Sequence, residues 1–407
     1  MKIDTNLDKL RAPPHGESRG RTVFILSLLA GALFLPMGLH LPYFPVWLAA
    51  RGFSNSEIAA ALAAPMVLRV VATPIVAAIA DKRGIAATLA ACALATFAGY
   101  CGLGFVRGFL PVFVGAALVA TTLGLMPALS DALTLAGIRR AEVAGLGYIA
   151  YGRIRVCTSL GVLSMMLLSG WIVTFFPGEE IIFALAALAL IPALIAIIAA
   201  TKLKTLQVHG APKGGLTEDT ARLRLAFAFI GAAALIQASH AEIYSFATLH
   251  WKLAGLPSGF IGAAWAIGVA SESVIFLATA RYFSAGKNAP SFLVFGGAGA
   301  VLRWLAMSAD PGPLWLIALQ AMHGLSFGAA YAGSVLSLAG IARDTHRARM
   351  QGWLATASAL SLAVSTFACG RLTNLYGEKT YLFMAGLAMA GLVLALSAAA
   401  LKRRIET

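Results

Sequence analysis

The sequence predicts an all-α integral membrane protein in which twelve transmembrane helices form two pseudo-symmetric halves of six. Three observations support this prediction: the composition, the succession of apolar stretches and an internal repeat. Hydrophobic residues make up 59% of the 407 residues and charged residues only 12%, whereas ordinary soluble domains have about 45–50% and 25%. This composition excludes a soluble globular fold.

Apolar stretches of roughly 17–25 residues are long enough to cross a bilayer as helices. Twelve stretches qualify: 22–49, 56–80, 85–106, 109–135, 148–171, 181–200, 224–250, 259–281, 291–308, 314–341, 350–373 and 380–401. They group into an N-terminal half at 22–200 and a C-terminal half at 224–401. Between and around the halves we predict a disordered cytoplasmic tail at 1–21, a cytoplasmic linker at 201–223 and a second tail at 402–407.

The net charge of +14 is explained by the placement of lysine and arginine residues on one side of the membrane. If the N-terminus is cytoplasmic, 22 of the 31 lysine and arginine residues fall in the tails and inner loops. The positive-inside rule therefore predicts that both termini lie in the cytoplasm, and we expect a multi-pass protein of a bacterial inner membrane. Because the basic residues are spread over short loops, they form no patch for nucleic acid. The polar start lacks the pattern of a cleaved signal peptide, and the four cysteines have unrelated spacings that indicate neither disulfides nor a metal site.

An internal repeat relates the two halves. "ARGFSNSEIAAALAA" at 50–64 aligns with "LAGLPSGFIGAAWAI" at 253–267 at an offset of 203 residues, which pairs Gly52 with Gly255 and Ile58 with Ile261. Alignments of helices rich in Ala and Gly also produce chance repeats, but the twelve spans and the central linker favour a true one. Parallel six-span repeats with a substrate site between them are typical of major facilitator transporters.

Four longer segments carry a family resemblance. "GLHLPYFPVWL", "YIAYGRIRVCTSLG", "ASHAEIYSFATLHWKLAGLPSGFIGAAWAIGVASE" and "LRWLAMSADPGPLWLIALQAMHGLSFGAAY" resemble the phenylpropionate-permease-like and lactose-permease-like proton symporter branches of the major facilitator superfamily. The loop "AAIADKRGIAA" is a worn version of the superfamily's gating loop, in which Asp81, Lys82 and Gly84 match the pattern and its other positions do not.

Ionisable residues inside a span are costly in lipid and are candidates for function. Counting along the helices places Arg69, Arg303 and His323 near mid-depth. The same count makes two ion pairs possible, Glu272 with Arg155 and Asp131 with Arg153. The resemblance implies that Glu272, Arg303 and His323 belong to the proton-coupling and substrate apparatus. The lactose branch has a second carboxylate where this chain has Ser326, so either Glu272 or Glu242 takes the proton, or coupling differs. Alternatively, Glu272 and Arg303 form a permanent structural pair.

Three helix faces carry polar and aromatic side chains at spacings of three or four residues, which lie on one side of a helix. These are His40, Tyr43 and Phe44 in the first span, Gln237, His240 and Tyr244 in the seventh, and Gln320, His323 and Phe327 in the tenth. The resemblance implies that these spans line the central cavity, so the nine residues are candidates for substrate binding. A single histidine on an apolar helix is more often a packing residue. Pro42 and Pro45 are expected to bend the outer end of the first span.

The sequence therefore predicts a secondary transporter that imports a small organic solute with protons by alternating access, as a monomer and without a cofactor. The resemblance implies an aromatic monocarboxylate such as a phenylpropionate. Arg303 would receive its carboxylate and the aromatic side chains its ring. The alternatives are a proton-coupled sugar or nucleoside symporter, an exporter of hydrophobic compounds, and a non-transporting assembly or sensor protein on the same fold. No enzyme motif occurs, so we do not expect an enzyme.

Overall fold

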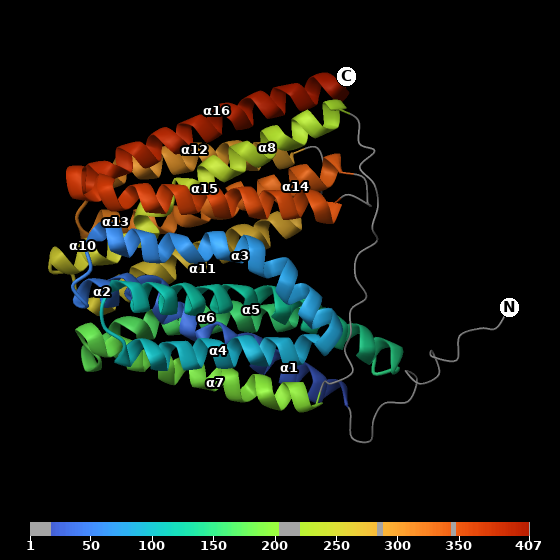
Figure 1. Cartoon of the computed structure of the whole chain (residues 1–407). Coiled ribbons are helices and arrows are strands. Elements are labelled where there is room, and N and C mark those ends of the chain that lie inside the picture. The colour runs from blue at the N-terminus through green and yellow to red at the C-terminus, as the bar shows by residue number, and fades with distance from the viewer. Residues whose placement is uncertain (1–17, 203–219, 283–287, 343–346, 407) are drawn as a thin grey trace. The chain divides into compact units, whose positions relative to one another are not determined.

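The computed structural model describes residues 18–202, 220–282, 288–342 and 347–406 (Figure 1). These residues are helical apart from short turns, and none of them forms a strand. The helices are α1 (Arg19–Leu33), α2 (Leu35–Ala50), α3 (Asn55–Arg83), α4 (Ile85–Phe105), α5 (Phe109–Val143), α6 (Tyr151–Phe175), η2 (Gly178–Glu180), α7 (Ile181–Lys202), α8 (Thr220–Ala238), α9 (Ala241–Ser245), α10 (Ala247–Leu253), α11 (Ser258–Tyr282), α12 (Ala289–Met307), α13 (Pro313–Ala321), η3 (Gly324–Ala329), α14 (Ala330–Ile341), α15 (Arg347–Tyr376), η4 (Gly377–Lys379) and α16 (Thr380–Glu406). Most of the predicted N-terminal tail and central linker lies outside the described residues.

The twelve predicted spans all coincide with helices. Nine of them, by length and composition, are helical stretches that could each cross a membrane, and a tenth stretch, Arg349–Arg404, contains the last two spans, α15 and α16. The remaining span is divided into α8, α9 and α10. The prediction of an all-α twelve-helix membrane protein is confirmed.

The described residues divide into two compact units. Unit 1 lies within Met1–Leu41, Val71–Met165 and Glu179–Gly210, and unit 2 within Pro42–Val70, Met166–Gly178 and Ala211–Thr407. The predicted division into an N-terminal and a C-terminal six-helix half is not tested by these units and remains a prediction. Within unit 1, helices α1, α4, α5 and α7 share one apolar core. Its fully buried members include Leu26, Leu89, Ala93, Met126, Leu133 and Ala193.

In unit 2, α8, α12, α15 and α16 pack side by side, as the upper part of Figure 1 shows. We call the end of these helices that lies away from the C-terminus the distal end. It contains the turns at 51–54, 254–257, 308–312 and 377–379. The sequence predicts that this end faces the outside.

Three spans are interrupted, the first, the seventh and the tenth. The first breaks at Phe34, two residues before Pro36, whose ring and missing N–H disfavour a continuous helix; the helix then runs on through Pro42 and Pro45. The predicted bend at those two prolines stays a prediction. The seventh span breaks at Ser239–His240 and again at Phe246. There the Ser239 hydroxyl donates to the carbonyl of Ile236 at 2.6 Å, a back-bond that tends to bend helices.

The repeat detected in the sequence reappears as matching turn geometry. Gly52 and Gly255 have φ angles of 82° and 81°. At the first turn, the N–H of Phe53 donates to the carbonyl of Leu48. At the second, the N–H of Leu256 donates to the carbonyl of Trp251, again 203 residues later. Both glycines therefore close a Schellman motif, which needs a left-handed residue that glycine supplies without steric cost.

Glycines bring helices of unit 2 into backbone contact near the distal end. A Cβ on Gly262 of α11 would lie 2.6 Å from the carbonyl oxygen of Met166 in α6. One on Gly170 of α6 would collide with the carbonyl oxygen of Ser258. The Tyr43 hydroxyl donates to that same carbonyl at 2.9 Å. The end segments of α2 and α6 are thus packed directly on the start of α11.

We expect Gly255→Ala to lower the melting temperature of the detergent-solubilised protein. A left-handed conformation costs a non-glycine residue roughly 1–2 kcal/mol. Gly259→Ala is the matched control, because Gly259 lies in the first turn of α11 and a Cβ there meets nothing within 4 Å. Equal melting temperatures for the two variants would contradict the assigned turn.

Candidate functional site

The tenth span is irregular where it carries its polar residues. Between α13 and α14 the residues Gly324–Ala329 form a π-helical turn, a feature frequent at functional sites. The N–H of Gly324 donates to the side-chain oxygen of Ser271 in α11 at 2.9 Å. A Cβ on Gly324 would collide with the Ser271 carbonyl. Glycine and serine therefore let α11 satisfy a backbone donor of the irregular turn, as an interrupted membrane helix requires.

Arg303 lies at the centre of the polar cluster and is completely buried. Its helix, α12, packs closely against the tenth span, because a Cβ on Gly296 of α12 would be 2.5 Å from the backbone nitrogen of Ala330 at the start of α14. This packing brings Arg303 to the tenth span. Its Nη1 donates to His323 Nδ1 and to Ser326 Oγ, and its Nη2 donates to Gln320 Oε1, each at 3.0 Å. We call Arg303, Gln320, His323, Ser326 and His240 the arginine cluster.

The hydrogen bonds of this cluster have a single consistent direction. A guanidinium only donates, so His323 Nδ1 and Ser326 Oγ accept from Arg303. Ser326 Oγ is then 3.3 Å from His240 Nε2, and His240 Nδ1 is 3.0 Å from the carbonyl oxygen of Ile236, which can only accept. With Ser326 donating to His240 Nε2, the chain of donors runs away from Arg303 and ends on the Ile236 carbonyl.

Two buried donors of the cluster lack an acceptor. Arg303 Nε and Gln320 Nε2 make no hydrogen bond in the structure. Arg303 also forms no ion pair with any carboxylate among the described residues. Buried donors left unmet are costly, and a buried cation ordinarily has an anionic partner. The cluster is therefore complementary to an anion that the described chain does not supply.

Aromatic rings surround the two histidines. The ring centroid of His240 lies 5.0 Å from that of Trp304, 5.7 Å from Phe327 and 5.9 Å from Tyr244. His323 stacks on Phe327 at 5.1 Å. Trp304 Nε1 donates to Ser239 Oγ at 2.9 Å and so anchors the break of the seventh span beside α12. These separations are those of favourable aromatic pairs.

The two candidate carboxylates have different surroundings. Glu272 of α11 places Oε2 3.8 Å from His323 Nε2, at the edge of the arginine cluster. Glu242 of α9 is 1% exposed, and both of its carboxylate oxygens lie 2.9 Å from the hydroxyl of Thr373 in α15. Within the described residues neither carboxylate is paired with Arg303, so the structural alternative, a permanent Glu272–Arg303 ion pair, does not form there.

The predicted residues of the first span have contacts of their own. His40 Nδ1 is 2.9 Å from the hydroxyl of Tyr100 in unit 1. Tyr43 is buried with its hydroxyl on Ser258, and Phe44 stacks on Trp47 at 5.3 Å. Gln237, a predicted binding residue of the seventh span, is 7% exposed in α8. For these four residues a role in substrate binding stays a prediction.

Three other charged residues predicted for the buried network are Asp131, Arg153 and Arg155. Asp131 accepts from the hydroxyl of Tyr151 at 2.9 Å, and no ion pair joins it to Arg153 among the described residues, which corrects that pairing. Arg155 lies 5.9 Å from the Phe34 ring centre in unit 1, while Glu272 lies in unit 2, so their ion pair remains a prediction.

Arg69 and the gating loop can be placed as well. Arg69 Nε donates to the carbonyl of Pro65 at 3.3 Å. Asp81 and Lys82 are exposed at the end of α3, and Gly84, with a φ of 92°, precedes α4. A left-handed φ explains glycine at this loop position, whereas its gating role remains a prediction.

Sequence reasoning missed three members of the site. Ser326 was noted only for the carboxylate it replaces, yet it contacts both Arg303 and His240. Trp304 and Ser239 were not singled out. Their signal was available, because Ser239 precedes His240 and Trp304 follows Arg303 in the sequence, but only the fold shows that the two residues meet.

Comparisons with known proteins agree with this architecture. Residues 27–399 match the MFS_1 like family. The chain is 26% identical over 370 residues to a protein of Escherichia coli (strain K12) named "Probable 3-phenylpropionic acid transporter", covering 89% of this chain and 94% of that protein. It is 29% identical over 327 residues to the maltose permease of Geobacillus stearothermophilus, covering 77% and 78%.

Solved structures with the same fold include the nucleoside transporter NupG, with a TM-score of 0.74 at 16% identity over 93% of this chain and 98% of that chain. Another is a POT family transporter in complex with 5-aminolevulinic acid, with a TM-score of 0.73 at 11% identity over 98% of this chain and 99% of that chain. At these identities the structures show the fold alone. The match across nearly the whole sequence shows that the chain belongs to the MFS_1 like family, and it is a secondary transporter of the major facilitator fold, not an enzyme.

Proposed function

We propose that this transporter imports a small aromatic monocarboxylate together with a proton, by alternating access. It would act as a monomer in a bacterial inner membrane with both termini in the cytoplasm. The observation that carries the proposal is the buried Arg303, whose guanidinium, among the described residues, donates only to Gln320, His323 and Ser326, none of which is a carboxylate. A substrate carboxylate would supply the missing anion and accept from the unmet Arg303 Nε and Gln320 Nε2.

The ring part of the substrate follows from the rings around the cluster. His240, Tyr244, Phe327 and Trp304 offer apolar faces and edges beside the guanidinium. Binding sites for small molecules commonly combine such apolar walls with a few polar groups that fix orientation. An aromatic ring linked by a short chain to a carboxylate fits both parts, and the name of the Escherichia coli relative is of the same chemical class.

A neutral sugar is the second candidate, because a maltose permease is 29% identical over 77% of this chain. Gln320, Ser326 and the histidines can bond hydroxyls. A neutral sugar would leave Arg303 without an anion, and we therefore prefer the monocarboxylate.

Both candidates can be tested in vesicles that contain the purified protein and an internal pH dye. 3-Phenylpropionate, maltose and uridine are added in turn, with empty vesicles as the control for passive entry of the acid. Internal acidification by the aromatic acid alone, above the empty-vesicle rate, is the expected result. Acidification by maltose or uridine would keep proton symport and overturn the substrate, whereas no acidification by any solute would contradict import with protons.

Arg303→Lys tests the anion site. Lysine keeps the positive charge but loses the planar set of donors, and hydrogen bonds to charged groups contribute about 1.5–3 kcal/mol. We expect the KM for 3-phenylpropionate to rise roughly 10–100-fold. The matched control is Arg107→Lys, since Arg107 is a largely exposed residue paired with Glu179. An unchanged KM in a folded Arg303→Lys protein would contradict binding of the substrate carboxylate at Arg303.

Glu272→Gln tests the proton step. Because Glu272 lies beside His323 at the edge of the arginine cluster, we propose that it carries the proton. Glutamine cannot exchange a proton, so we expect proton-driven accumulation to fall to the background of empty vesicles while exchange of labelled for unlabelled substrate continues. Loss of exchange as well would point to a structural role for Glu272.

Glu242→Gln provides the comparison. An amide can accept the same hydrogen bond from Thr373 that the carboxylate accepts now. We expect accumulation within about twofold of wild type, because an isosteric replacement keeps the bond without a charge. The reverse pattern, with accumulation lost in Glu242→Gln and retained in Glu272→Gln, would assign the proton to Glu242.

A further inference from the structure

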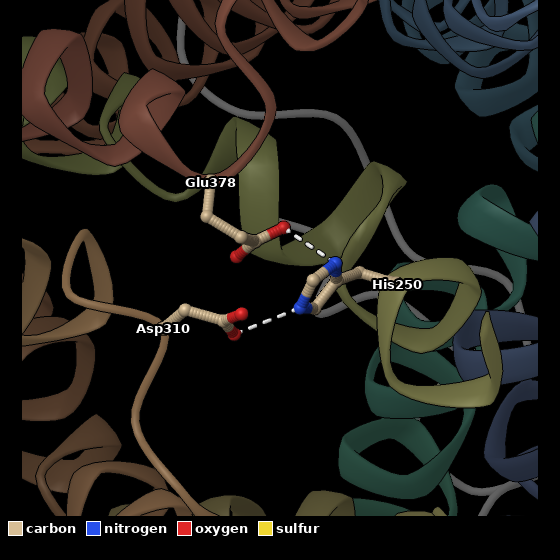
Figure 2. Close-up of side chains that lie close together, drawn as sticks. All are labelled: His250, Asp310 and Glu378. Carbon is tan, nitrogen blue, oxygen red and sulfur yellow. Dashed lines mark hydrogen bonds and ion pairs between the residues drawn. The ribbon is translucent and has the colours of Figure 1, made fainter. Parts of the chain in front are cut away.

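Three side chains that the transport proposal does not use meet at the distal end of unit 2 (Figure 2). His250 Nε2 lies 2.9 Å from Asp310 Oδ1, and His250 Nδ1 lies 3.0 Å from Glu378 Oε1. One ligand atom from each residue can be chosen so that all three lie within 4.8 Å of one another. We call these three residues the distal triad.

The triad joins three separate parts of the chain. His250 is on α10, Asp310 is in the turn between α12 and α13, and Glu378 is in η4. The two turns are also tied together without the histidine, because Lys379 Nζ donates to the carbonyl of Ser308 at 3.0 Å. The two carboxylates are therefore held near each other by the fold, and the positive charge of Lys379 is directed to that carbonyl.

The surroundings provide both order and access. The side chain of Glu378 is 15% exposed and that of His250 27% exposed, so both are partly fixed by packing. The side chain of Asp310 is 61% exposed, so its carboxylate can change orientation and water can reach the triad from that side. An ion held by three protein donors needs that access to complete its coordination with water.

The chemistry of the donors selects a class of ion. Zinc binds imidazole nitrogen at about 2.0–2.1 Å and carboxylate oxygen at about 2.0–2.2 Å, so neighbouring donors on one ion lie roughly 3–3.5 Å apart. In the triad the contacts of 2.9 and 3.0 Å are made to opposite ring nitrogens of His250, so only one of them has the separation of two donors on one ion. One ligand atom from each residue nevertheless lies within 4.8 Å of the others, so small side-chain rotations would bring the three donors together. An imidazole favours zinc and similar transition ions, whereas magnesium and calcium prefer sites built of oxygen alone.

We propose that His250, Asp310 and Glu378 form a binding site for one divalent transition-metal ion of the Zn²⁺ class. The ion bonds one nitrogen of His250, and the two carboxylates turn toward it from their present positions on opposite ring nitrogens. Its two positive charges neutralise both carboxylates, and it links α10 to the turns beside α13 and α16. The proposal does not depend on the transported solute.

The test is direct binding to the full-length protein, purified in detergent without a polyhistidine tag. ZnCl₂ is titrated by calorimetry at pH 8, because burial raises the pKa of the Glu378 carboxyl to about 7 and a carboxylate ligand must be ionised. We expect one Zn²⁺ per chain and a higher melting temperature with ZnCl₂ than with MgCl₂ at the same concentration.

Variants locate the ion. Loss of a ligand should weaken binding at least roughly tenfold, since even groups that only orient metal ligands contribute that much. We expect this loss in His250→Ala and in Glu378→Gln. Glu179→Gln is the matched control, because it removes an exposed carboxylate of unit 1.

Two results would overturn the proposal. One is Zn²⁺ binding of unchanged affinity in His250→Ala, which would place the ion on other histidines or cysteines. The other is no saturable binding by a wild-type protein that is monodisperse and melts cooperatively. The melting temperature of each variant without metal shows whether it is folded. If His250→Ala or Glu378→Gln does not fold, Asp310→Asn, which changes the most exposed of the three ligands, takes its place and should also weaken Zn²⁺ binding.

Discussion

The structure of unit 2 is organised around a buried positive charge that has no negative partner in the described chain. A guanidinium removed from water within a membrane protein is costly unless most of its donors find acceptors. Here the acceptors are an amide, an imidazole and a hydroxyl, all from the tenth span. Neutral acceptors stabilise the cation in the absence of substrate and leave its charge uncompensated. A site of this kind attracts an anion without binding a second charge permanently.

The irregular helices are a consequence of the same constraint. A regular α-helix has about 3.6 residues per turn, so its side chains face a neighbouring helix only at fixed intervals. The π-helical turn after His323 and the break at His240 place side chains of two spans around Arg303. Each irregular position is supported by a side chain of another helix, Ser271 in one case and Trp304 through Ser239 in the other. Glycines at the crossing points make those contacts short enough.

Much of the fold and part of the site could be predicted from the sequence. The twelve spans followed from apolar length, and the pairing of Gly52 with Gly255 followed from the offset between repeats. Arg303, His323, His240 and Tyr244 were identified because a polar residue in an apolar helix is conspicuous. Ser326 and Ser239 were not identified as members, since a serine in a membrane helix is common and most serines bond their own backbone. The pairing of Asp131 with Arg153 was wrong because helical spacing gives the side of a helix but not the competing hydroxyl of Tyr151. The distal triad was invisible for a similar reason: its members are far apart in the sequence and lie in three different elements.

The contact between α6 and α11 has a further mechanical consequence. At Gly170 and Gly262 the backbones touch without intervening side chains, so no flexible layer can absorb a small displacement. Dispersion forces fall off within about an ångström of separation, and water cannot enter until the gap is wide enough to hold a molecule. Partial separation at this contact therefore costs attraction without gaining hydration. The contact resists small displacements, and this resistance comes from residues that have no side chain at all.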